Sequence, residues 1–436
     1  MPITAFQNHI TTLCARMDRA LERSGHDHCL IAAGVEKMRF LDDMPYPFKV
    51  NPQFKAWAPL THHPDCWIVY TPGATPVLVY VQPDDYWHLP PAPPSGYWTH
   101  VLDVRVVHAA ADAARHFPKS GRIAILGEAD AALPGFVPDN PTALLDYLHF
   151  HRAFKTPYEI AMMKVAQRHA VAGHDAAHAC FLGGGSELDI HRAYLAASGH
   201  SDLDLPYGNI VALNEHGATL HYQYQQAKAP EQHRSLLIDA GAEHAGYAAD
   251  ITRTWGGGDE RFTALIAGVD RAQQALAAQV RPGMDYRELH IQAHLHLGGV
   301  LRDLNVVKMT PEAMLETGVS SIFFPHGLGH PIGLQVHDVA GFMESDAGGT
   351  LAKPDGHPFL RMTRTLEPGM VVTIEPGLYF IDLLLAKLKA GPHADAVGWG
   401  VVEHLRRFGG VRIEDDVHCT DGEPENLTRD AFAGKH

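Results

Sequence analysis

The chain has 436 residues, of which 46% are hydrophobic and 19% are charged. This length exceeds what one ordinary hydrophobic core needs and predicts two domains, while a composition close to that of soluble proteins and the lack of an 18-residue apolar run argue against a membrane protein. The 50 acidic residues outnumber the 35 lysines and arginines, and the resulting net charge of −15 disfavours a nucleic-acid backbone as a partner.

The first 25 residues form an amphipathic segment with charges of both signs. They lack the continuous apolar core and cleavage pattern of a secretory signal, so we expect a cytoplasmic protein. The cysteines are odd in number and widely spaced, which is typical of reduced structural thiols: Cys14, Cys29, Cys66, Cys180 and Cys419. The 31 histidines, together with the acidic excess, favour a divalent-metal site with nitrogen and oxygen ligands.

Short apolar runs alternate with turns over the first third of the chain. The runs that we expect to be strands are 29–33, 67–70, 77–81 and 122–126. The segment 82–97 is rich in proline and aromatic residues, which predicts a rigid surface excursion rather than a strand or a helix. Together these features indicate a small α/β domain.

Helix signals dominate from Thr156 onward. Thr156 can cap a helix, Pro157 occupies its first position, and Glu159 completes a capping box. The expected helix runs to about Phe181 and ends at the glycines 183–185, and Ser186 begins another in the same way. Further helices are expected at 259–280 and 285–304. We therefore predict one domain at 1–155 and a second at 156–436.

A β-hairpin is expected at residues 236–254, where two β-rich runs flank a turn region with Gly241 and Gly246. If the turn is centred near His244, Asp239 lies opposite Asp250 and their Cβ atoms are about 5 Å apart. Two opposed carboxylates repel each other. The pair therefore predicts a neighbouring cation or a proton.

Two more carboxylates lie in equally apolar surroundings, at Glu375 and Glu414. Burial of an unpaired acid is unfavourable, so four such acids in one domain suggest a shared site. The segment 326–338 (HGLGHPIGLQVHD) can add an imidazole. Such a five-ligand set fits two divalent ions with a water or hydroxide between them.

The order Asp239, Asp250, His330, Glu375 and Glu414 resembles the ligand order of the pita-bread metallopeptidases, a family that includes methionine aminopeptidase, aminopeptidase P and prolidase (Xaa-Pro dipeptidase). The phrases GYAADITRTW, HGLGHPIGLQVHDVAGFM, EPGMVVTIEPGLYFID and GGVRIEDDV are most similar to bacterial prolidases, which are related to organophosphorus acid anhydrolases. The resemblance covers the whole chain. It implies a mixed α/β fold in which a small N-terminal α/β domain precedes a C-terminal pita-bread catalytic domain.

The resemblance also implies roles for individual residues. The five matched residues would hold two divalent ions, with Asp250 and Glu414 bridging them. Manganese is the expected metal, and cobalt, zinc or iron would also suit such ligands. A hydroxide between the ions would attack the Xaa-Pro carbonyl, and Glu375 would carry the proton to the leaving nitrogen.

Other matches concern the substrate. His337 and His221 would support the reacting carbonyl, and Tyr207 would line the pocket. Arg361 would bind the free carboxylate of a dipeptide, although Arg364 is close enough in sequence to be confused with it. Arg412 would assist Arg361 in binding the substrate or would orient Glu414, and His326 would order the loop.

The expected function is therefore hydrolysis of Xaa-Pro dipeptides by a homodimer, with organophosphorus triesters as a possible side substrate. Two alternatives stay open: an aminopeptidase P that cleaves longer Xaa-Pro peptides, and a non-catalytic pita-bread binding protein, which the intact ligand set disfavours. The histidine clusters at 26–29 and 62–66 lack a complete known ligand spacing. We expect them to be surface or packing residues.

Overall fold

The computed structural model describes residues 3–435, so the extreme ends of the two expected domain ranges, residues 1–2 and 436, lie outside it. The chain divides into two compact units. The first comprises residues up to 162 together with 245–247 and 345–349, and the second comprises 163–244, 248–344 and the residues from 350 onward. Among the described helices, none is long and apolar enough to cross a membrane.

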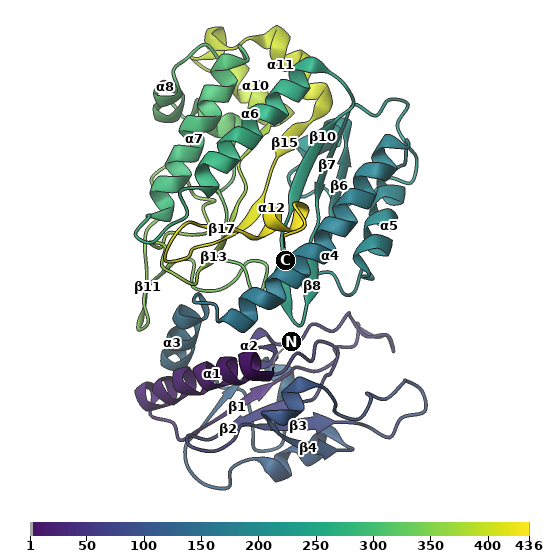
Figure 1. Ribbon diagram of the computed structural model, residues 1–436, viewed down its shortest axis with the longest axis vertical. Coiled ribbons are helices and arrows are strands. Elements are labelled where there is room, and N and C mark those ends of the chain that lie inside the picture. Colours follow the sequence, from purple (N-terminus) through teal and green to yellow (C-terminus); the bar gives the residue numbers. More distant parts are fainter. Residues whose placement is uncertain (1–2, 436) are drawn as a thin grey trace. The chain divides into compact units, whose positions relative to one another are not determined.

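The first unit contains a five-stranded sheet in the order β4-β3-β2-β1-β5 (Figure 1). β1 pairs antiparallel with β2 and parallel with β5, and β3 pairs antiparallel with β2 and parallel with β4. The strands are β1 (His28–Ala32), β2 (Trp67–Tyr70), β3 (Val77–Val81), β4 (Asp103–Val107) and β5 (Ile123–Leu126). The helices of this unit are α1 (Ile3–Ser24), α2 (Pro52–Lys55) and α3 (Thr142–Arg152), with 3-10 turns at Tyr97–His100, Ala110–His116 and Ala129–Ala131.

The amphipathic opening segment forms α1, which buries Phe6, Ile10 and Met17 on one side. The hydroxyl of Tyr70, on β2, donates to the Asp18 carboxylate of α1 at 2.5 Å, so the helix is fastened to the sheet. Four of the strands were predicted from their apolar runs and are confirmed. β4 was missed because its sequence, DVRVV, carries two charged residues and only its last residue is buried.

Residues 82–96 have neither helix nor strand, which confirms the predicted surface excursion. Tyr86 is 86% exposed and Leu89 is 96% exposed in this segment. The histidine clusters at 26–29 and 62–66 make ordinary hydrogen bonds, such as His63 with Tyr80 at 3.0 Å and His28 with Thr71 at 2.8 Å. All five cysteines are free, as expected.

Helix α4 (Pro157–Leu182) begins and ends close to its predicted limits. The backbone N–H of Thr156 donates to the Glu159 carboxylate at 2.7 Å, and the Glu159 N–H approaches the Thr156 hydroxyl at 3.4 Å, which is the predicted capping box. α5 (Glu187–Ser198) starts with a second capping box between Ser186 and Asp189. The predicted helix starts are therefore confirmed.

The second unit is built around two groups of strands. β6 (Ile210–Leu213), β7 (Ser235–Asp239) and β10 (Thr252–Gly256) form an antiparallel sheet in the order β10-β7-β6. α4 and α5 cover one face of it, where Phe181 and Tyr194 pack with Val211, Leu236 and Ile238 (Figure 1). The opposite face of this sheet packs against the second group of strands, where Ala212 and Leu237 contact Tyr379.

The second group comprises β13 (Val371–Ile374), β16 (Asp415–His418) and β17 (Glu425–Asn426), and the pair β14 (Gly377–Tyr379) and β15 (Gly410–Arg412). A single bridge between Thr252 and Glu414 joins the two groups, and the Glu414 N–H donates to the Thr252 carbonyl at 3.1 Å. Short hairpins add β8 (Ala242–His244) with β9 (Tyr247–Ala249) and β11 (Met343–Ser345) with β12 (Gly348–Thr350).

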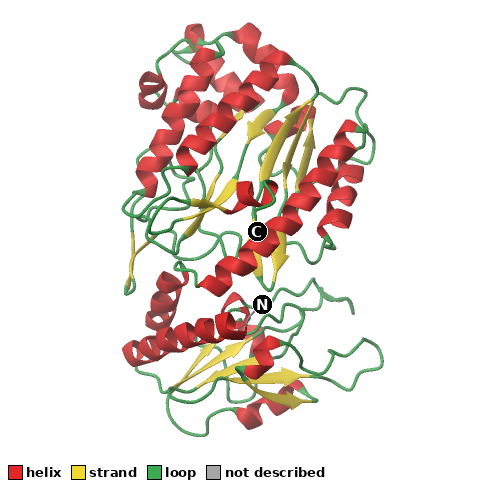
Figure 2. Ribbon diagram, viewed as in Figure 1, coloured by secondary structure: helices red, strands yellow, loops and turns green. Residues whose placement is uncertain are grey.

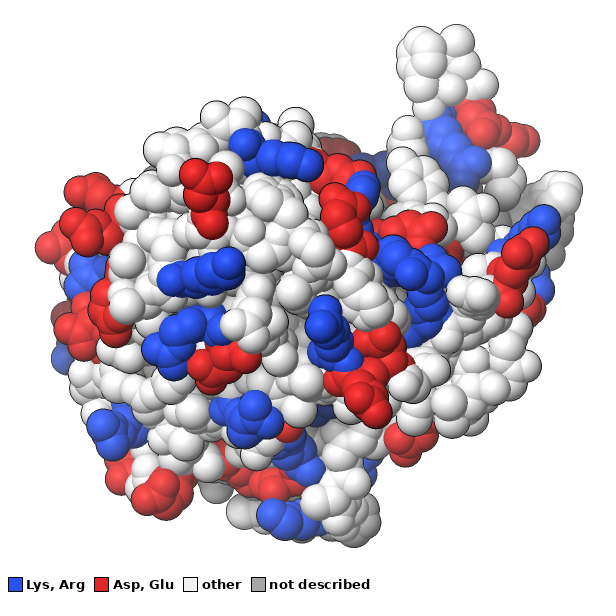
Figure 3. Space-filling model, turned by 90° about the horizontal axis from the view of Figure 1, so that it is seen from above, with Lys and Arg blue, Asp and Glu red and all other residues white. Residues whose placement is uncertain are grey.

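The remaining helices of the second unit are α6 (Glu260–Ala277), α7 (Tyr286–Asp303), α8 (Pro311–Glu316), α9 (Val319–Phe323), α10 (Asp382–Lys389), α11 (Trp399–Leu405) and α12 (Leu427–Phe432), as Figure 2 shows in red. Asp259 and Asp285 cap α6 and α7, which confirms the two helices expected there. On the face shown in Figure 3, basic and acidic side chains intermingle, so the acidic excess does not gather into one field there.

The hairpin that carries the first two aspartates differs from its predicted register. Asp239 pairs with Thr252, not with Asp250. The two-residue turn lies at Ala245 and Gly246, which have φ values of 52° and 90°. Two successive positive φ values are typical of a type I′ turn, which fits the twist of a hairpin. The turn is therefore one residue later than expected, and Asp250 is diagonal to Asp239 rather than opposite it.

Candidate metal centre

His330 and Glu375 are brought together by local backbone pairing. The Thr373 N–H donates to the His330 carbonyl at 2.9 Å, and the Glu375 N–H donates to the Leu328 carbonyl at 2.8 Å. This pairing runs the segment 328–332 alongside β13. Gly329 is required there, because a Cβ at that position would overlap the carbonyl oxygen of Thr373. The glycines of this segment thus let it lie directly against the strand.

Asp239, Asp250 and Glu414 come from the junction of the two strand groups. Asp239 ends β7, Asp250 precedes β10, and Glu414 lies between β15 and β16. The bridge from Thr252 to Glu414 places Glu414 next to the aspartate hairpin. One ligand atom each from Asp250, His330 and Glu414 lie within 4.8 Å of one another, and all three side chains are buried.

A single pocket of about 630 Å³ collects these groups. All five residues predicted to bind metal line it, as do four of the predicted catalytic and substrate residues: His221, His337, Arg361 and Arg412. His326 also lines it, together with the apolar residues Leu220, Phe342, Phe359, Ile381 and Leu384. The pocket thus combines a polar floor with apolar walls, which is usual for a small-molecule site.

The tautomer of His330 follows from its hydrogen bond. Nδ1 of His330 lies 3.0 Å from the Pro331 carbonyl, which can only accept, so Nδ1 carries the proton. Nε2 is then unprotonated, and its lone pair is available to a metal ion. It lies 3.6 Å from carboxylate oxygens of both Asp250 and Glu375. Metal-binding histidines are commonly fixed by such a hydrogen bond from the second ring nitrogen.

Arg412 organises the other side of the pocket and is 4% exposed. Its guanidinium donates to Asp239 Oδ2 at 2.6 Å, to the Tyr379 hydroxyl at 2.8 Å and to the Thr252 hydroxyl at 3.2 Å. The Thr252 hydroxyl donates in turn to Glu414 Oε2 at 2.6 Å. One buried cation therefore orients two of the carboxylates, one directly and one through a hydroxyl.

His326 lies at the far end of the same network. Its Nδ1 is 2.8 Å from the Gly327 carbonyl, so Nε2 accepts from the Tyr379 hydroxyl at 2.9 Å. Tyr379 accepts from Arg412 and donates to His326. His326 therefore supports the site through its hydrogen bond with Tyr379, which accepts from Arg412. It makes no hydrogen bond to the carboxylates within residues 3–435.

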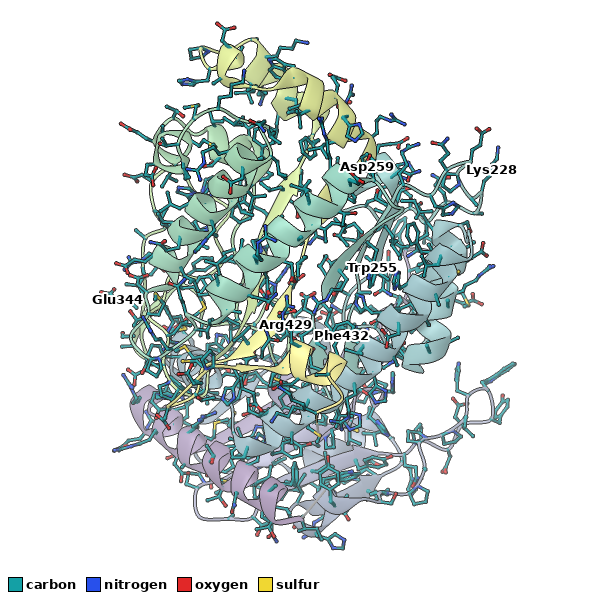
Figure 4. The ribbon with its side chains drawn as sticks, turned by 45° about the horizontal axis from the view of Figure 1, so that its top comes forward. Lys228, Trp255, Asp259, Glu344, Arg429 and Phe432 are labelled. Atoms are coloured by element: carbon teal, nitrogen blue, oxygen red, sulfur yellow. The ribbon has the colours of Figure 1, made fainter. Side chains whose placement is uncertain are left out.

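Two partly buried arginines, Arg253 and Arg429, hold the strand that follows Glu414. Asp415 is fully buried and accepts from Arg253 and Arg429, each at 2.7 Å. Arg253 also donates to the Glu414 carbonyl at 2.8 Å. Arg429 and Phe432 both come from α12 (Figure 4). The guanidinium of Arg253 lies over the ring of Phe432. These charged hydrogen bonds fix the backbone at Glu414, so its side chain projects into the pocket.

Three carboxyl groups of the pocket, Asp250, Glu375 and Glu414, have raised pKa values. Burial raises the pKa of Asp250 well above its usual range, and the nearby charges of Asp239 and Asp416 raise it further. Burial likewise raises the pKa of Glu414, reinforced by Asp250 and Glu375. The pKa of Glu375 rises to about 7, again mainly through burial. Such a cluster is stable only with protons or with cations.

The donor set fits divalent metal ions. Asp239 Oδ1 is buried and has no hydrogen-bond partner among residues 3–435. An unsatisfied buried carboxylate oxygen is unfavourable, and a cation would satisfy it. Four carboxylates and one imidazole suit hard or borderline ions such as manganese, cobalt, iron or zinc.

Of the residues predicted to contact the substrate, Arg361 lines the pocket and Tyr207 does not. Arg361 is exposed, and its guanidinium approaches Nδ1 of His337 at 3.4 Å. Tyr207 is not among the residues that line the pocket. Its hydroxyl donates to Asp250 Oδ1 at 2.5 Å, so its contact is with a carboxylate of the cluster. Arg364 is buried and donates to Glu367 at 3.2 Å.

Four residues of the site were not predicted. Thr252 and Tyr379 connect the carboxylates to Arg412, as described above, and Lys353 lines the pocket. Asp416 is fully buried, and its carboxylate accepts from the Asp250 N–H at 3.1 Å and from Gln167. Only Thr252 left a signal in the sequence, because it lies two residues after Asp250 and therefore on the same face of the strand.

Comparison with protein families identifies the class. Residues 161–421 match the model of metallopeptidase family M24, and residues 4–150 match the model described as the Xaa-Pro dipeptidase N-terminal domain. The chain belongs to metallopeptidase family M24. The family predicted from the ligand order is thereby confirmed, as is the prediction of a metallopeptidase.

Two relatives show how far the likeness extends. A Xaa-Pro dipeptidase of Stenotrophomonas maltophilia (strain K279a) is 54% identical over 434 residues, which are 99% of this chain and 98% of that protein. A Xaa-Pro dipeptidase of Xanthomonas campestris pv. campestris (strain 8004) is 55% identical over 430 residues, which are 98% of each. The similarity therefore covers both units and the site.

Solved structures support the fold. The aminopeptidase PepP of Pseudomonas aeruginosa superposes with a TM-score of 0.73 at 22% identity, covering 98% of this chain and 95% of that one. The zinc-substituted aminopeptidase P of E. coli in complex with product gives 0.70 at 24% identity, covering 99% and 96%. The predicted combination of an N-terminal α/β domain and a C-terminal pita-bread domain is confirmed.

Proposed function

We propose that the chain is a Xaa-Pro dipeptidase, which hydrolyses the bond before a C-terminal proline. The observation that carries the proposal is one pocket that is lined by four carboxylates together with His330, His337 and Arg361. The relatives that share more than half of its residues over nearly its whole length are Xaa-Pro dipeptidases, which supports the same substrate class.

The proposed metal ligands are Asp239, Asp250, His330, Glu375 and Glu414, which would together hold two divalent ions. We propose manganese as the metal, with cobalt, zinc and iron as the alternatives that the same ligands accept. When bound, two such ions supply Lewis acidity to the scissile carbonyl and increase the acidity of a water molecule.

Proton transfer is proposed for Glu375. Its pKa of about 7 in the metal-free pocket shows how strongly burial favours its neutral form, so it can accept a proton from the attacking water. The same carboxyl then delivers the proton to the departing imide nitrogen. This delivery is needed because a proline nitrogen carries no hydrogen while it is in the peptide bond.

His337 is proposed to stabilise the charge that develops on the carbonyl oxygen. Because Arg361 donates to Nδ1 of His337, the ring carries its proton on Nε2. Burial, followed by the charge of Arg361, lowers the pKa of His337 to about 4, so the ring is neutral at physiological pH. The Nε2–H can then donate to the substrate, and His221, at the rim of the pocket, is proposed to assist.

The free carboxylate of the dipeptide is proposed to bind Arg361. Arg412 is fully engaged with Asp239, Tyr379 and Thr252. Arg364 is buried and is not among the residues that line the pocket. Arg361 is exposed on the pocket wall, so its planar guanidinium is the one best placed to receive a carboxylate.

Tyr207 and Arg412 are proposed to act on the carboxylates rather than on the substrate, because their hydroxyl and guanidinium groups donate to Asp250 and Asp239. Both side chains are thus placed to orient proposed metal ligands, where the sequence had predicted contacts with the substrate. Hydrolysis of organophosphorus triesters remains a prediction of the resemblance.

A cytoplasmic homodimer is also proposed, with the domain boundary between residues 155 and 156. The family-model matches end at 150 and begin again at 161, which is compatible with that boundary. Large apolar side chains are exposed on two loops of the first unit: Phe40 at 89%, Leu41 at 90%, Trp87 at 77% and Leu89 at 96%. Exposed apolar residues of this kind favour a subunit contact.

The test is activity of the metal-stripped full chain on Ala-Pro and on Ala-Pro-Ala, with each divalent metal added back separately. We expect Ala-Pro to be hydrolysed only after metal is restored, with manganese giving the highest rate. Comparable cleavage of Ala-Pro-Ala would replace the proposal by an aminopeptidase P. Stoichiometric metal binding is required by both enzymes, so a protein that binds none and cleaves neither peptide would be a non-catalytic binding protein.

A further inference from the structure

Three histidines outside the carboxylate pocket form a second cluster in the second unit. His290 and His294 lie one turn apart on α7, and His357 comes from the loop after β12. The three rings have centroids 4.7 to 4.8 Å apart in every pair. One ring nitrogen of each lies within 4.8 Å of those of the other two. Neither the proposed function nor its metal ligands involve these residues.

The hydrogen bonds of the cluster leave ring nitrogens available. Nδ1 of His294 is 2.9 Å from the Ser320 hydroxyl, whereas its Nε2 is buried and has no hydrogen-bond partner within residues 3–435. Nδ1 of His290 is likewise buried without one, and its Nε2 is 2.9 Å from Nδ1 of His357. Both helical histidines are 1% exposed, so water outside the protein cannot satisfy these atoms.

The cluster is also in the protonation state that metals require. Burial, followed by the charges of the neighbouring rings, lowers the pKa of His290 to about 2 and that of His294 to about 3. Neutral imidazole is the form that binds metal. Two histidines four residues apart on a helix are a recurrent zinc-binding pair, because that spacing puts both on one face.

The distances are compatible with a shared ion. Two nitrogens that are both bound to a tetrahedral zinc at about 2.0–2.1 Å are about 3.3 Å apart. Nε2 of His290 and Nδ1 of His357 are 2.9 Å apart, which is a few tenths of an ångström shorter, so these two nitrogens, joined by a hydrogen bond, are the ones that a shared ion would separate. A small rotation of the His357 ring, which is only half-buried, would open it. Phe324 packs against His294 and His290 and closes the other side of the cluster.

We propose that His290, His294 and His357 form a second metal site, which binds one zinc-like transition-metal ion independently of the carboxylate centre. Three imidazoles suit zinc, nickel or copper, whereas the carboxylate centre suits harder ions, so the two sites differ in the metals that they select. The fourth coordination position is open to a water molecule. Ser320 acts as the outer hydrogen-bond partner that orients His294.

The histidine cluster is connected to the catalytic pocket through the segment 353–361. His357 belongs to the segment 353–361, and Lys353, Phe359 and Arg361 of this segment line the catalytic pocket. A metal that binds His357 to α7 would fix that segment to a helix. Zinc at the three histidines is therefore expected to order the pocket wall without touching the carboxylates.

The test is a metal count on full-length protein in which the carboxylate centre has been removed. The double variant Asp250→Asn/Glu414→Gln is stripped, dialysed against zinc and measured by mass spectrometry, and the visible spectrum of the cobalt-loaded protein reports the ligand geometry. We expect one zinc per chain and a tetrahedral cobalt spectrum. Adding His357→Ala should weaken zinc binding at least about 100-fold, since loss of a direct ligand exceeds the loss of an outer partner. Ser320→Ala should weaken it about 10–100-fold.

The matched control is His296→Ala, which removes a half-buried histidine from the same helix but outside the cluster. It should leave the zinc count unchanged. If the double variant fails to fold, the count on the otherwise unaltered protein decides, because His357→Ala should lower it by one ion per chain. The proposal is overturned if the zinc count and affinity are the same with and without His357. A failure of Xaa-Pro hydrolysis would leave this result unaffected, so the two proposals fail separately.

Discussion

Arg412 donates a hydrogen bond of 2.6 Å to Asp239 Oδ2, while Oδ1 of the same carboxylate is buried and has no hydrogen-bond partner in the described part of the chain. The arginine thus fixes one oxygen of Asp239 and leaves the other directed at the carboxylate pocket. Because the guanidinium also holds Thr252, the same side chain orients Glu414 through a hydroxyl. A buried arginine in this position prepares two proposed ligands before any ion is bound.

Replacement of Arg412 by lysine should therefore weaken metal binding without removing a proposed ligand. An ammonium group cannot make three directed hydrogen bonds in the plane that the guanidinium uses. We expect the affinity for manganese to fall about 10–100-fold, with much of the activity restored by excess metal. Isothermal titration calorimetry measures the affinity, and Arg406→Lys, on an exposed ion pair, is the control. An unchanged affinity would show that Arg412 does not position the ligands.

Asp250→Asn should abolish metal binding and nearly all turnover. The amide keeps the size of the carboxylate but removes the charge that a shared divalent ion requires. The matched control is Asp416→Asn, at a neighbouring buried acid whose pKa burial raises well above its usual range. Burial favours the neutral form of that acid, and Asp416 is not among the proposed ligands, so its amide should retain metal. Full metal content and a normal rate in the Asp250 variant would remove Asp250 from the ligand set.

The sequence predicted the parts of the fold that depend on local signals. The capping boxes at Thr156 and Ser186 marked helix starts because each involves residues only three apart. The predicted register of the 236–254 hairpin was wrong by one residue at the turn. The reason is that Ala245, and not a glycine or asparagine, occupies the first turn position, with φ of 52°. Alanine in that conformation is uncommon, so the turn gave no recognisable signal.

The candidate site was predictable where its residues match a family pattern and not where they meet through tertiary packing. The contact of Arg412 with Asp239 joins residues 173 positions apart, and that of His290 with His357 joins residues 67 apart. Neither spacing is a local motif. Only the four-residue spacing of His290 and His294 was visible in the sequence, and on its own it is as typical of a packed helix as of a metal site.

The pH dependence of stability should reveal Glu375 in the metal-free protein. Its pKa is raised from an ordinary 4.5 to about 7, so the folded state holds a proton that the unfolded state releases between these pH values. The free energy of unfolding therefore falls as the pH rises through this window. The loss is complete above pH 7 and amounts to about 3 kcal/mol at about 1.4 kcal/mol per pH unit.

Buried histidines with lowered pKa values, such as His330, act in the opposite direction below about pH 6.5, so the measurement has to isolate Glu375. We expect Glu375→Gln to gain stability relative to the unaltered protein as the pH is raised from 4.5 to 8. Denaturant unfolding of both proteins without metal gives the difference at each pH. A difference that does not change with pH would mean that Glu375 titrates normally in the folded chain.

Gly329→Ala should destabilise the protein and lower its metal content together. An added Cβ would overlap the carbonyl of Thr373 and crowd the Tyr286 hydroxyl, so the segment that carries His330 must move away from β13. Overpacking of this kind costs about 1–3 kcal/mol. Gly299→Ala is the control, because a Cβ there meets nothing within 4 Å and alanine favours the helix. Thermal unfolding and metal analysis of both variants test this. A Gly329 variant with an unchanged Tm and metal content would contradict the close contact between residue 329 and the Thr373 carbonyl.

Arg361→Gln should remove the preference for a free C-terminal carboxylate. A charged hydrogen bond contributes about 1.5–3 kcal/mol, so kcat/KM should fall about 10–100-fold more for Ala-Pro than for Ala-Pro amide, on which the variant acts only through the lost contact with His337. The ratio of the two substrates is the readout, because a variant with a damaged pocket would lose both. Lys353 also lines the pocket, but its ammonium donates to the Pro358 carbonyl at 2.6 Å, so Lys353→Gln should leave the ratio nearly unchanged. The reverse outcome, with the preference lost in the lysine variant and kept in the arginine variant, would transfer carboxylate recognition from Arg361 to Lys353.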